Sequence, residues 1–113
     1  MIKKFFNKSI LNKNNSIKEA IENLALSGLQ ICFVCDGKKL LGTITDGDIR
    51  RALIDNKNFS ELKARDLMNS NPLTALESDN LQVAEQRMRE AKVQCLIVKN
   101  PINEVVGVIQ IFE

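Results

Sequence analysis

Apolar and polar residues follow each other along this chain in a pattern that predicts two helices of similar design. The first helix begins after Ser16, which stands three residues before Glu19 and so has the spacing of a capping box. The second begins after the polar run 78–80. In both, apolar residues recur every three or four positions and share one side of a helix. They are Ile17, Ala20, Ile21 and Leu24 in the first helix, and Leu81, Ala84, Met88 and Ala91 in the second.

Each helix is followed by two short apolar runs joined by a turn, which predicts a hairpin of two strands. The first hairpin spans 31–45 and turns at Asp36-Gly37, and the second spans 95–111 and turns at Asn100-Pro101. The other expected elements are a helix at 46–56, short extended pieces at 9–11 and 72–75, a polar linker at 56–60 and one helical turn at 64–68.

The two halves of the chain are copies of one pattern. Ile17 corresponds to Leu81 and Val34 to Val98, each 64 residues apart, and one extra residue in the second turn then aligns Gly42 with Gly107. The sequence predicts two repeats, at 1–58 and 59–113. Each is too small to bury its own apolar face, so we expect the copies to pack together around one core.

The second copy stops at residue 113, where the first copy begins the helix expected at 46–56. A repeat without its covering helix would leave apolar sheet surface bare. We therefore expect the natural chain to continue beyond Glu113.

The candidate chemistry lies at the junction between the first hairpin and the helix after it. Thr45 and Asp48 follow the strand, and Gly47 and Arg51 lie in the first turns of the helix. Exposed N–H groups and the positive end of the helix dipole make such a junction a place to hold a phosphate. Thr45 and Asp48 also have the spacing of a capping box, in which each side chain satisfies a backbone donor of the other. The local sequence leaves both interpretations open.

Composition argues for a globular protein without nucleic-acid or membrane chemistry. The chain of 113 residues is 44% hydrophobic and 27% charged, and its net charge is +2 with five Phe as the only aromatic residues. That charge is too small for a nucleic-acid footprint, and the basic N-terminal stretch is interpreted as a solvated face. No apolar run approaches the about 18 residues that span a bilayer, and the first residues lack the continuous apolar region that is typical of a secretion signal. We expect a cytoplasmic location.

Cys32 and Cys35 have the spacing of a redox or metal pair. They lie in an apolar strand, however, and residues three apart on a strand point to opposite faces. The chain has no histidine and only Cys95 as a further thiol, so a zinc site lacks ligands. Buried packing residues are the favoured interpretation, and no metal or cofactor is expected.

Several motifs together resemble tandem cystathionine-β-synthase (CBS) domain pairs over nearly the whole chain. They are the two repeats, the turn 42–48, Asp66-Leu67-Met68 and the run 71–74. The resemblance implies an α/β (α+β) fold of two βαββα repeats packed about a pseudo-twofold axis, here with the second repeat lacking its last helix. It also implies clefts between the copies that bind adenine nucleotides or adenosyl compounds.

Within the resemblance, the ribose- and phosphate-binding motif falls on Thr45 and Asp48. The Asp48 carboxylate can accept hydrogen bonds from ribose hydroxyls, Thr45 and the amides near Gly47 face phosphate, and Arg51, with Arg50 as the weaker candidate, pairs with phosphate oxygens. Ser9 and Ile10 would contact the base. In the second copy Gln110 and Glu113 occupy the matching positions, which implies a weaker second site.

The resemblance implies a non-catalytic regulatory module of the kind attached to sugar-phosphate isomerases or sugar nucleotidyltransferases. A methionine just ahead of the repeat favours a module that precedes a nucleotidyltransferase, with the catalytic domain on its C-terminal side. The alternative is a dimerisation or structural module with a vestigial cleft, since such pairs often form homodimers. A small enzyme with Asp46 and Asp48 as a magnesium pair is the weakest of the three, because the chain offers no nucleophile with a base.

Overall fold

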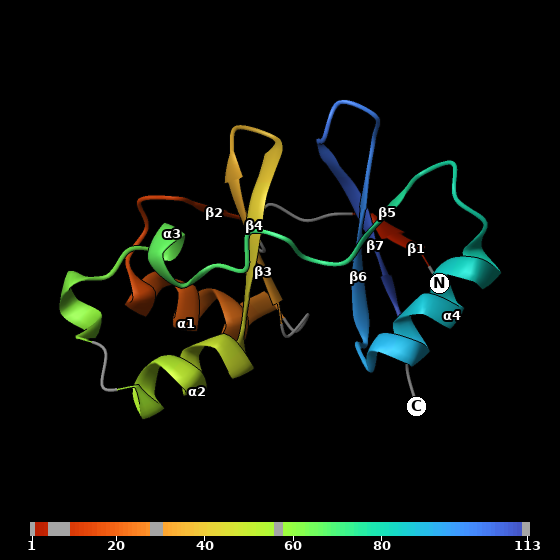
Figure 1. Ribbon diagram of the computed structural model, residues 1–113. Helices are drawn as coiled ribbons and strands as arrows, with labels where there is room; N and C mark the ends of the chain where they lie inside the picture. Colours follow the sequence, from red (N-terminus) through yellow and green to blue (C-terminus); the bar gives the residue numbers. More distant parts are fainter. Residues whose placement is uncertain (1, 5–9, 28–30, 56–57, 112–113) are drawn as a thin grey trace. The chain divides into compact units, whose positions relative to one another are not determined.

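The computed structural model describes residues 2–4, 10–27, 31–55 and 58–111, which belong to two compact units (Figure 1). The first unit comprises residues 6–72, and the second comprises residues 1–5 and 73–113. The compact units therefore divide the chain differently from the repeats predicted at 1–58 and 59–113. Two segments account for the difference: the N-terminal strand pairs within the second unit, and the residues around 59–72 pack on the first.

The first unit is a three-stranded sheet with helices on one face. Its elements are β2 (Ile10–Asn12), α1 (Ile17–Ser27), β3 (Ile31–Asp36), β4 (Lys39–Thr45), α2 (Asp46–Ile54), a 3-10 helix (Phe59–Glu61) and α3 (Ala64–Leu67). The strand order is β2-β3-β4, with β2 parallel and β4 antiparallel to β3. Gly37 has φ +63° in the β3–β4 turn, a backbone conformation that favours glycine.

The second unit repeats this plan around a four-stranded sheet. Its elements are β1 (Ile2–Lys4), β5 (Thr74–Leu76), α4 (Leu81–Ala91), β6 (Cys95–Lys99) and β7 (Val105–Gln110). The strand order is β1-β7-β6-β5, and β1 runs antiparallel to β7. The described part of this unit ends at Ile111 and holds no counterpart of α2.

The register of the strands confirms the predicted duplication. Val34 lies opposite Gly42 in the first unit, and Val98 lies opposite Gly107 in the second. The register shifts directly after both valines, at Val34/Cys35 and Val98/Lys99. Because a slip of one residue would turn every side chain to the other face, this agreement means that the same positions are buried in both copies.

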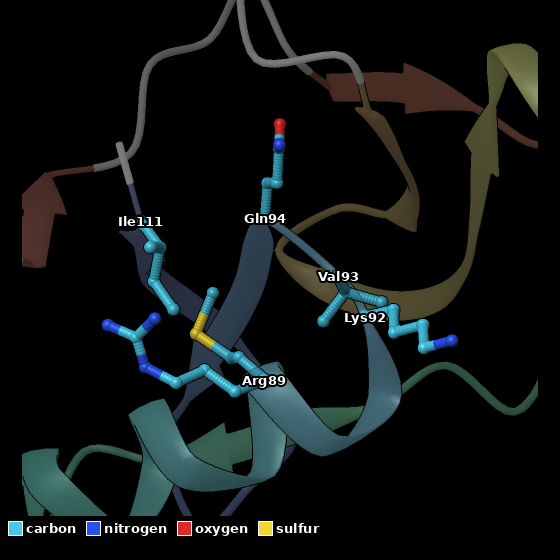
Figure 2. A pocket seen from close by; sticks show the side chains of 6 residues that line it. Arg89, Lys92, Val93, Gln94 and Ile111 are labelled. Carbon is cyan, nitrogen blue, oxygen red and sulfur yellow. The ribbon is translucent and has the colours of Figure 1, made fainter. Parts of the chain in front are cut away.

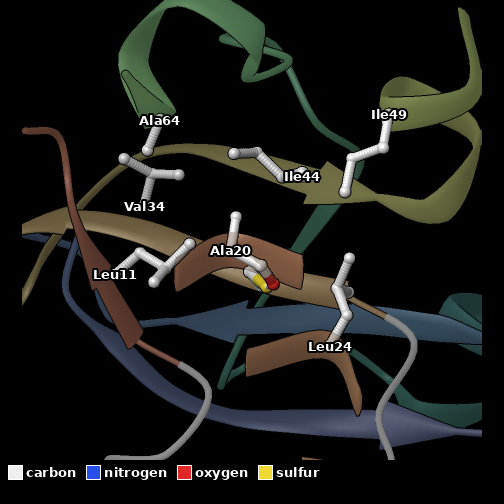
Figure 3. Packing of buried hydrophobic residues seen from close by; sticks show 8 residues of the cluster. Leu11, Ala20, Leu24, Val34, Ile44, Ile49 and Ala64 are labelled. Atoms are coloured by element: carbon white, nitrogen blue, oxygen red, sulfur yellow. Dashed lines mark hydrogen bonds between the residues drawn. The ribbon is translucent and has the colours of Figure 1, made fainter. Parts of the chain in front are cut away.

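The core of the first unit lies between its sheet and its helices. Leu11, Val34 and Ile44 from the strands meet Ala20 and Leu24 of α1, Ile49 of α2 and Ala64 of α3 (Figure 3). The second unit has an equivalent cluster, made of Ala75, Ala84, Met88, Leu96, Val98 and Ile109. The helix starts hold as predicted: Ser16 and Glu19 form a capping box, and the Asn80 side chain accepts from two amides of α4.

Two expectations about these elements are wrong. Ile21 and Leu81 belong to the predicted apolar stripes, but they are 43% and 39% exposed, and Ala91 is exposed as well. The helices bury a narrower stripe because each covers only one small sheet. The linker expected at 56–60 includes the start of a 3-10 helix, and Phe59 packs against the core cluster. The basic N-terminal stretch contains β1, and the burial of its side chains lies outside what the structure describes.

Gly42 lets a second segment approach the edge of the first sheet. Asn69 forms an antiparallel bridge with Thr43, in which the Thr43 amide donates to the Asn69 carbonyl at 3.0 Å and the Asn69 amide donates to the Thr43 carbonyl at 2.8 Å. A Cβ atom at Gly42 would lie 2.6 Å from the Asn69 carbonyl oxygen and 2.9 Å from the Met68 sulfur. Glycine is therefore required at this position by the close approach of a backbone, which holds the segment after α3 in place.

Gly42→Ala is expected to lower the free energy of unfolding by about 1 to 3 kcal/mol, because the added methyl group must push the Met68–Asn69 backbone away. Urea denaturation followed by circular dichroism measures the change. Gly47→Ala is the matched control. Its Cβ would meet its nearest neighbours at 3.5 Å or more, an ordinary contact distance, so no loss of stability is expected. Equal stability of Gly42→Ala and the unmutated protein would contradict the role given to the bridge.

Candidate ligand site at the start of α2

The start of α2 is closed by a reciprocal pair of side chains. The Thr45 amide donates to Asp48 Oδ2 at 2.9 Å, the Asp48 amide donates to Thr45 Oγ1 at 3.3 Å, and the Thr45 hydroxyl donates to Asp48 Oδ2 at 3.1 Å. This is the capping box that the spacing allowed. One carboxylate oxygen of Asp48 is therefore committed to the backbone and side chain of Thr45.

The other carboxylate oxygen of Asp48 meets Arg51. An Arg51 guanidinium nitrogen, Nη2, donates to Asp48 Oδ1 at 2.5 Å, one helical turn along. The Asp48 side chain is 15% exposed and that of Arg51 is 69% exposed, so the ion pair lies at the surface with the carboxylate beneath the guanidinium. Both residues are predicted ligand residues, but the contact between them is not among the predictions. The sequence signal for this contact is the spacing of three residues between opposite charges on a helix.

The structure brings four of the predicted ligand residues together and leaves Ile10 apart from them. A Cβ atom at Gly47 would lie 3.5 Å from Arg51 Nη1 and 3.6 Å from Thr45 Oγ1, so Gly47 belongs to the same group as Thr45, Asp48 and Arg51. Ile10 lies on β2, opposite Phe33 of β3, which in turn lies opposite Thr43 of β4. Two strand spacings, roughly 10 Å, thus separate Ile10 from β4. Ser9 lies outside the described residues.

The second copy differs at the matching strand end. Gln110 lies opposite Cys95, just as Thr45 lies opposite Ile31, so the structure places Gln110 at the position equivalent to Thr45. Its Oε1 atom is buried and has no hydrogen-bond partner among the described residues. Glu113, the predicted counterpart of Asp48, lies outside the described residues.

A pocket of about 360 Å³ opens in the second unit, and the residues that line it include none of the predicted ligand residues (Figure 2). It is lined by Met88, Arg89, Lys92, Val93, Gln94 and Ile111. Met88 corresponds to Leu24 of the first unit, where Ile49 of α2 packs in the same cluster as Leu24 (Figure 3). The pocket therefore lies on the face that α2 covers in the first unit.

Cys32 and Cys35 are buried in β3, Cys95 is half-buried at the start of β6, and the three do not form a disulfide. Cys32 and Cys35 are free thiols, and the Cys32 thiol donates to Asn23 Oδ1 at 3.1 Å. Burial raises the pKa of Cys32 to about 12, with the charge of Asp46 adding to the shift. Burial also raises the pKa of Cys35 and of Cys95 to about 11. All three thiols are therefore protonated at neutral pH, which suits packing rather than nucleophilic chemistry.

Two negative findings concern the part of the chain that the structure describes. Within it, no group of three or more His, Cys, Asp or Glu side chains is placed to hold a metal ion. Its helices are also too short and too polar for any of them to cross a membrane.

The chain is similar to known proteins in both sequence and fold. The family model of the CBS domain matches residues 1–55 and 64–111. An arabinose 5-phosphate isomerase of Escherichia coli is 36% identical over 99 residues, which cover 87% of this chain and 30% of that protein. The chain thus spans less than a third of the length of this curated relative.

Two solved structures are similar in fold over most of their length. A CBS domain pair in complex with 5′-methylthioadenosine and S-adenosyl-L-methionine has a TM-score of 0.81 and 26% identity, covering 96% of this chain and 87% of that one. A CBS domain protein from Pyrobaculum aerophilum complexed with AMP has a TM-score of 0.77 and 26% identity, covering 89% of this chain and 78% of that one.

The buried thiols predict a pH dependence of stability. Unfolded thiols ionise near pH 9, whereas folded Cys32 and Cys35 ionise only near 12 and 11. Their contribution to the free energy of unfolding is therefore complete below about pH 8.5 and is lost as the pH rises through the folded values. Urea denaturation between pH 7 and 11 should show a smaller alkaline loss for the double variant Cys32→Ala/Cys35→Ala than for the unmutated protein. Parallel profiles would show that the thiols ionise equally in both states.

Proposed function

Because the chain belongs to the CBS domain family, we propose that it is a regulatory module that binds an adenine nucleotide or adenosyl compound and modulates an attached enzyme. The observation that carries the proposal is the convergence of Thr45, Asp48 and Arg51 at the start of α2. The two solved relatives that hold AMP or adenosyl compounds support the ligand class.

Each residue has a role that follows from its chemistry. Asp48 Oδ1 lies at the outer side of the carboxylate and would accept hydrogen bonds from ribose hydroxyls, while Oδ2 stays in the capping box. The Arg51 guanidinium would donate to phosphate oxygens in a forked arrangement. The amides of the first turn and the positive end of the α2 dipole add attraction for the same anion.

We further propose that the attached enzyme is a sugar-phosphate isomerase. The support is the similarity to arabinose 5-phosphate isomerases, which are much longer than this chain. The expected sugar nucleotidyltransferase gains no support from these relatives. The ligand would shift the enzyme between two states by the difference in its affinity for them, so a large effect requires contacts that exist in only one state.

The structure also gives a specific reason to keep the alternative of a dimerisation or structural module. The Asp48 carboxylate already accepts a hydrogen bond from the backbone amide of Thr45 at the start of its own helix. In a vestigial site, this capping role would be the only role of Asp48. Large apolar side chains are exposed on both long helices of the first unit: Leu26 is 79% exposed on α1, and Ile54 is 75% exposed on α2. Exposed apolar side chains of this size can contribute to an interface between copies.

Isothermal titration calorimetry with AMP, ATP and S-adenosylmethionine tests the proposal. Asp48→Ala is expected to weaken binding at least tenfold, since it removes the acceptor for the ribose. Glu19→Ala is the matched control, because Glu19 is the carboxylate of the other capping box, at the start of α1. Both variants remove the carboxylate of a capping box, but Glu19→Ala should bind normally.

A different result would favour the structural module. If none of the three ligands releases or takes up heat at millimolar concentration, the sensor function is wrong. A ligand that binds the folded state must raise the melting temperature. If sedimentation then shows a dimer and no nucleotide changes its melting temperature, the exposed apolar side chains of α1 and α2 are assigned to self-association.

A further inference from the structure

The contact between Arg51 and Asp48 competes with the ribose of the proposed ligand. A carboxylate oxygen has about two acceptor positions, so the two oxygens of Asp48 provide about four. Oδ2 uses its positions for the amide and the hydroxyl of Thr45, at 2.9 and 3.1 Å. Oδ1 gives one position to Arg51. Only one remains, whereas a ribose offers two neighbouring hydroxyl donors.

The competition has a different outcome for ligands with and without a phosphate. A nucleoside that displaces Arg51 from Asp48 leaves the guanidinium without its carboxylate and offers no anion in exchange. A nucleotide offers a phosphate, to which guanidinium groups donate strong, charge-assisted hydrogen bonds. Arg51 is 69% exposed and is attached by a flexible stem, so it can exchange one acceptor for the other with little rearrangement of the helix.

We propose that Arg51 is a specificity-determining residue that favours phosphorylated adenosine ligands over unphosphorylated ones, because it occupies Asp48 Oδ1 until a phosphate draws it away. This inference rests on the proposed function of the same site. The solved relatives hold ligands of both kinds: AMP carries a phosphate, and 5′-methylthioadenosine does not. The proposed role of Arg51 predicts which of these two kinds this chain prefers.

The test compares AMP with adenosine on the unmutated protein and on Arg51→Gln. The variant is expected to bind AMP three- to tenfold more weakly, because it loses the phosphate contact. It should bind adenosine two- to fivefold more tightly, because Asp48 Oδ1 is released. Lys18→Gln is the control for net charge: Lys18 is an exposed cation on α1, and its removal should change neither affinity by as much as twofold.

A third ligand isolates the role of Asp48. Adenosine without its 2′ and 3′ hydroxyls has no donor for the carboxylate, so Arg51→Gln should give it no gain in affinity. If Arg51→Gln weakens AMP and adenosine equally, or leaves their affinity ratio unchanged, the specificity role of Arg51 is wrong while the proposed function stands. If neither AMP nor adenosine binds the unmutated protein, the specificity role of Arg51 is wrong; the proposed function is wrong as well if ATP and S-adenosylmethionine also fail to bind.

Discussion

The carboxylate of Asp48 links the fold of the first unit to its chemistry. Its inner oxygen completes the first turn of α2 through Thr45, and that turn orients Ile49 into the core cluster. Its outer oxygen is the one group of this side chain that a ligand can address without unwinding the helix. The capping and binding interpretations of the sequence are therefore compatible, because they use different atoms of one side chain.

The two copies share a backbone plan but differ in the chemistry at equivalent strand ends. The strands have the same register and the same irregularity in both units, so Thr45 and Gln110 occupy equivalent positions. Only Thr45 is followed by a described helix whose first turn supplies amides and a carboxylate. A shared backbone plan thus positions a site, while the residues at the strand end and the helix behind them determine whether it has the chemistry to hold an anion.

Features governed by neighbours in sequence could be predicted, and features governed by distant contacts could not. The capping box at Ser16 and the turn at Gly37 depend on residues within four positions, so their spacing was sufficient, while the spacing at Thr45 allowed a capping box without deciding for it. The bridge from Thr43 to Asn69 and the strand β1 join residues far apart in the chain, where no local pattern specifies a partner. Within the site, both Arg51 and Asp48 could be identified from the sequence. Which acceptor the Arg51 guanidinium pairs with could not, because that depends on the folded geometry.

The pairing of β1 with β7 has a mechanical consequence. Ile2 lies opposite Ile109 and Lys4 opposite Gly107, so the N-terminal end of β1 lies beside the C-terminal end of β7. Tension between the N-terminal end of β1 and the C-terminal end of β7 would break the hydrogen bonds between these strands one after another. It would not load all of them at once in shear. A neighbouring domain that pulled on this module would thus release β1 at low force, before the central strands of either sheet yield.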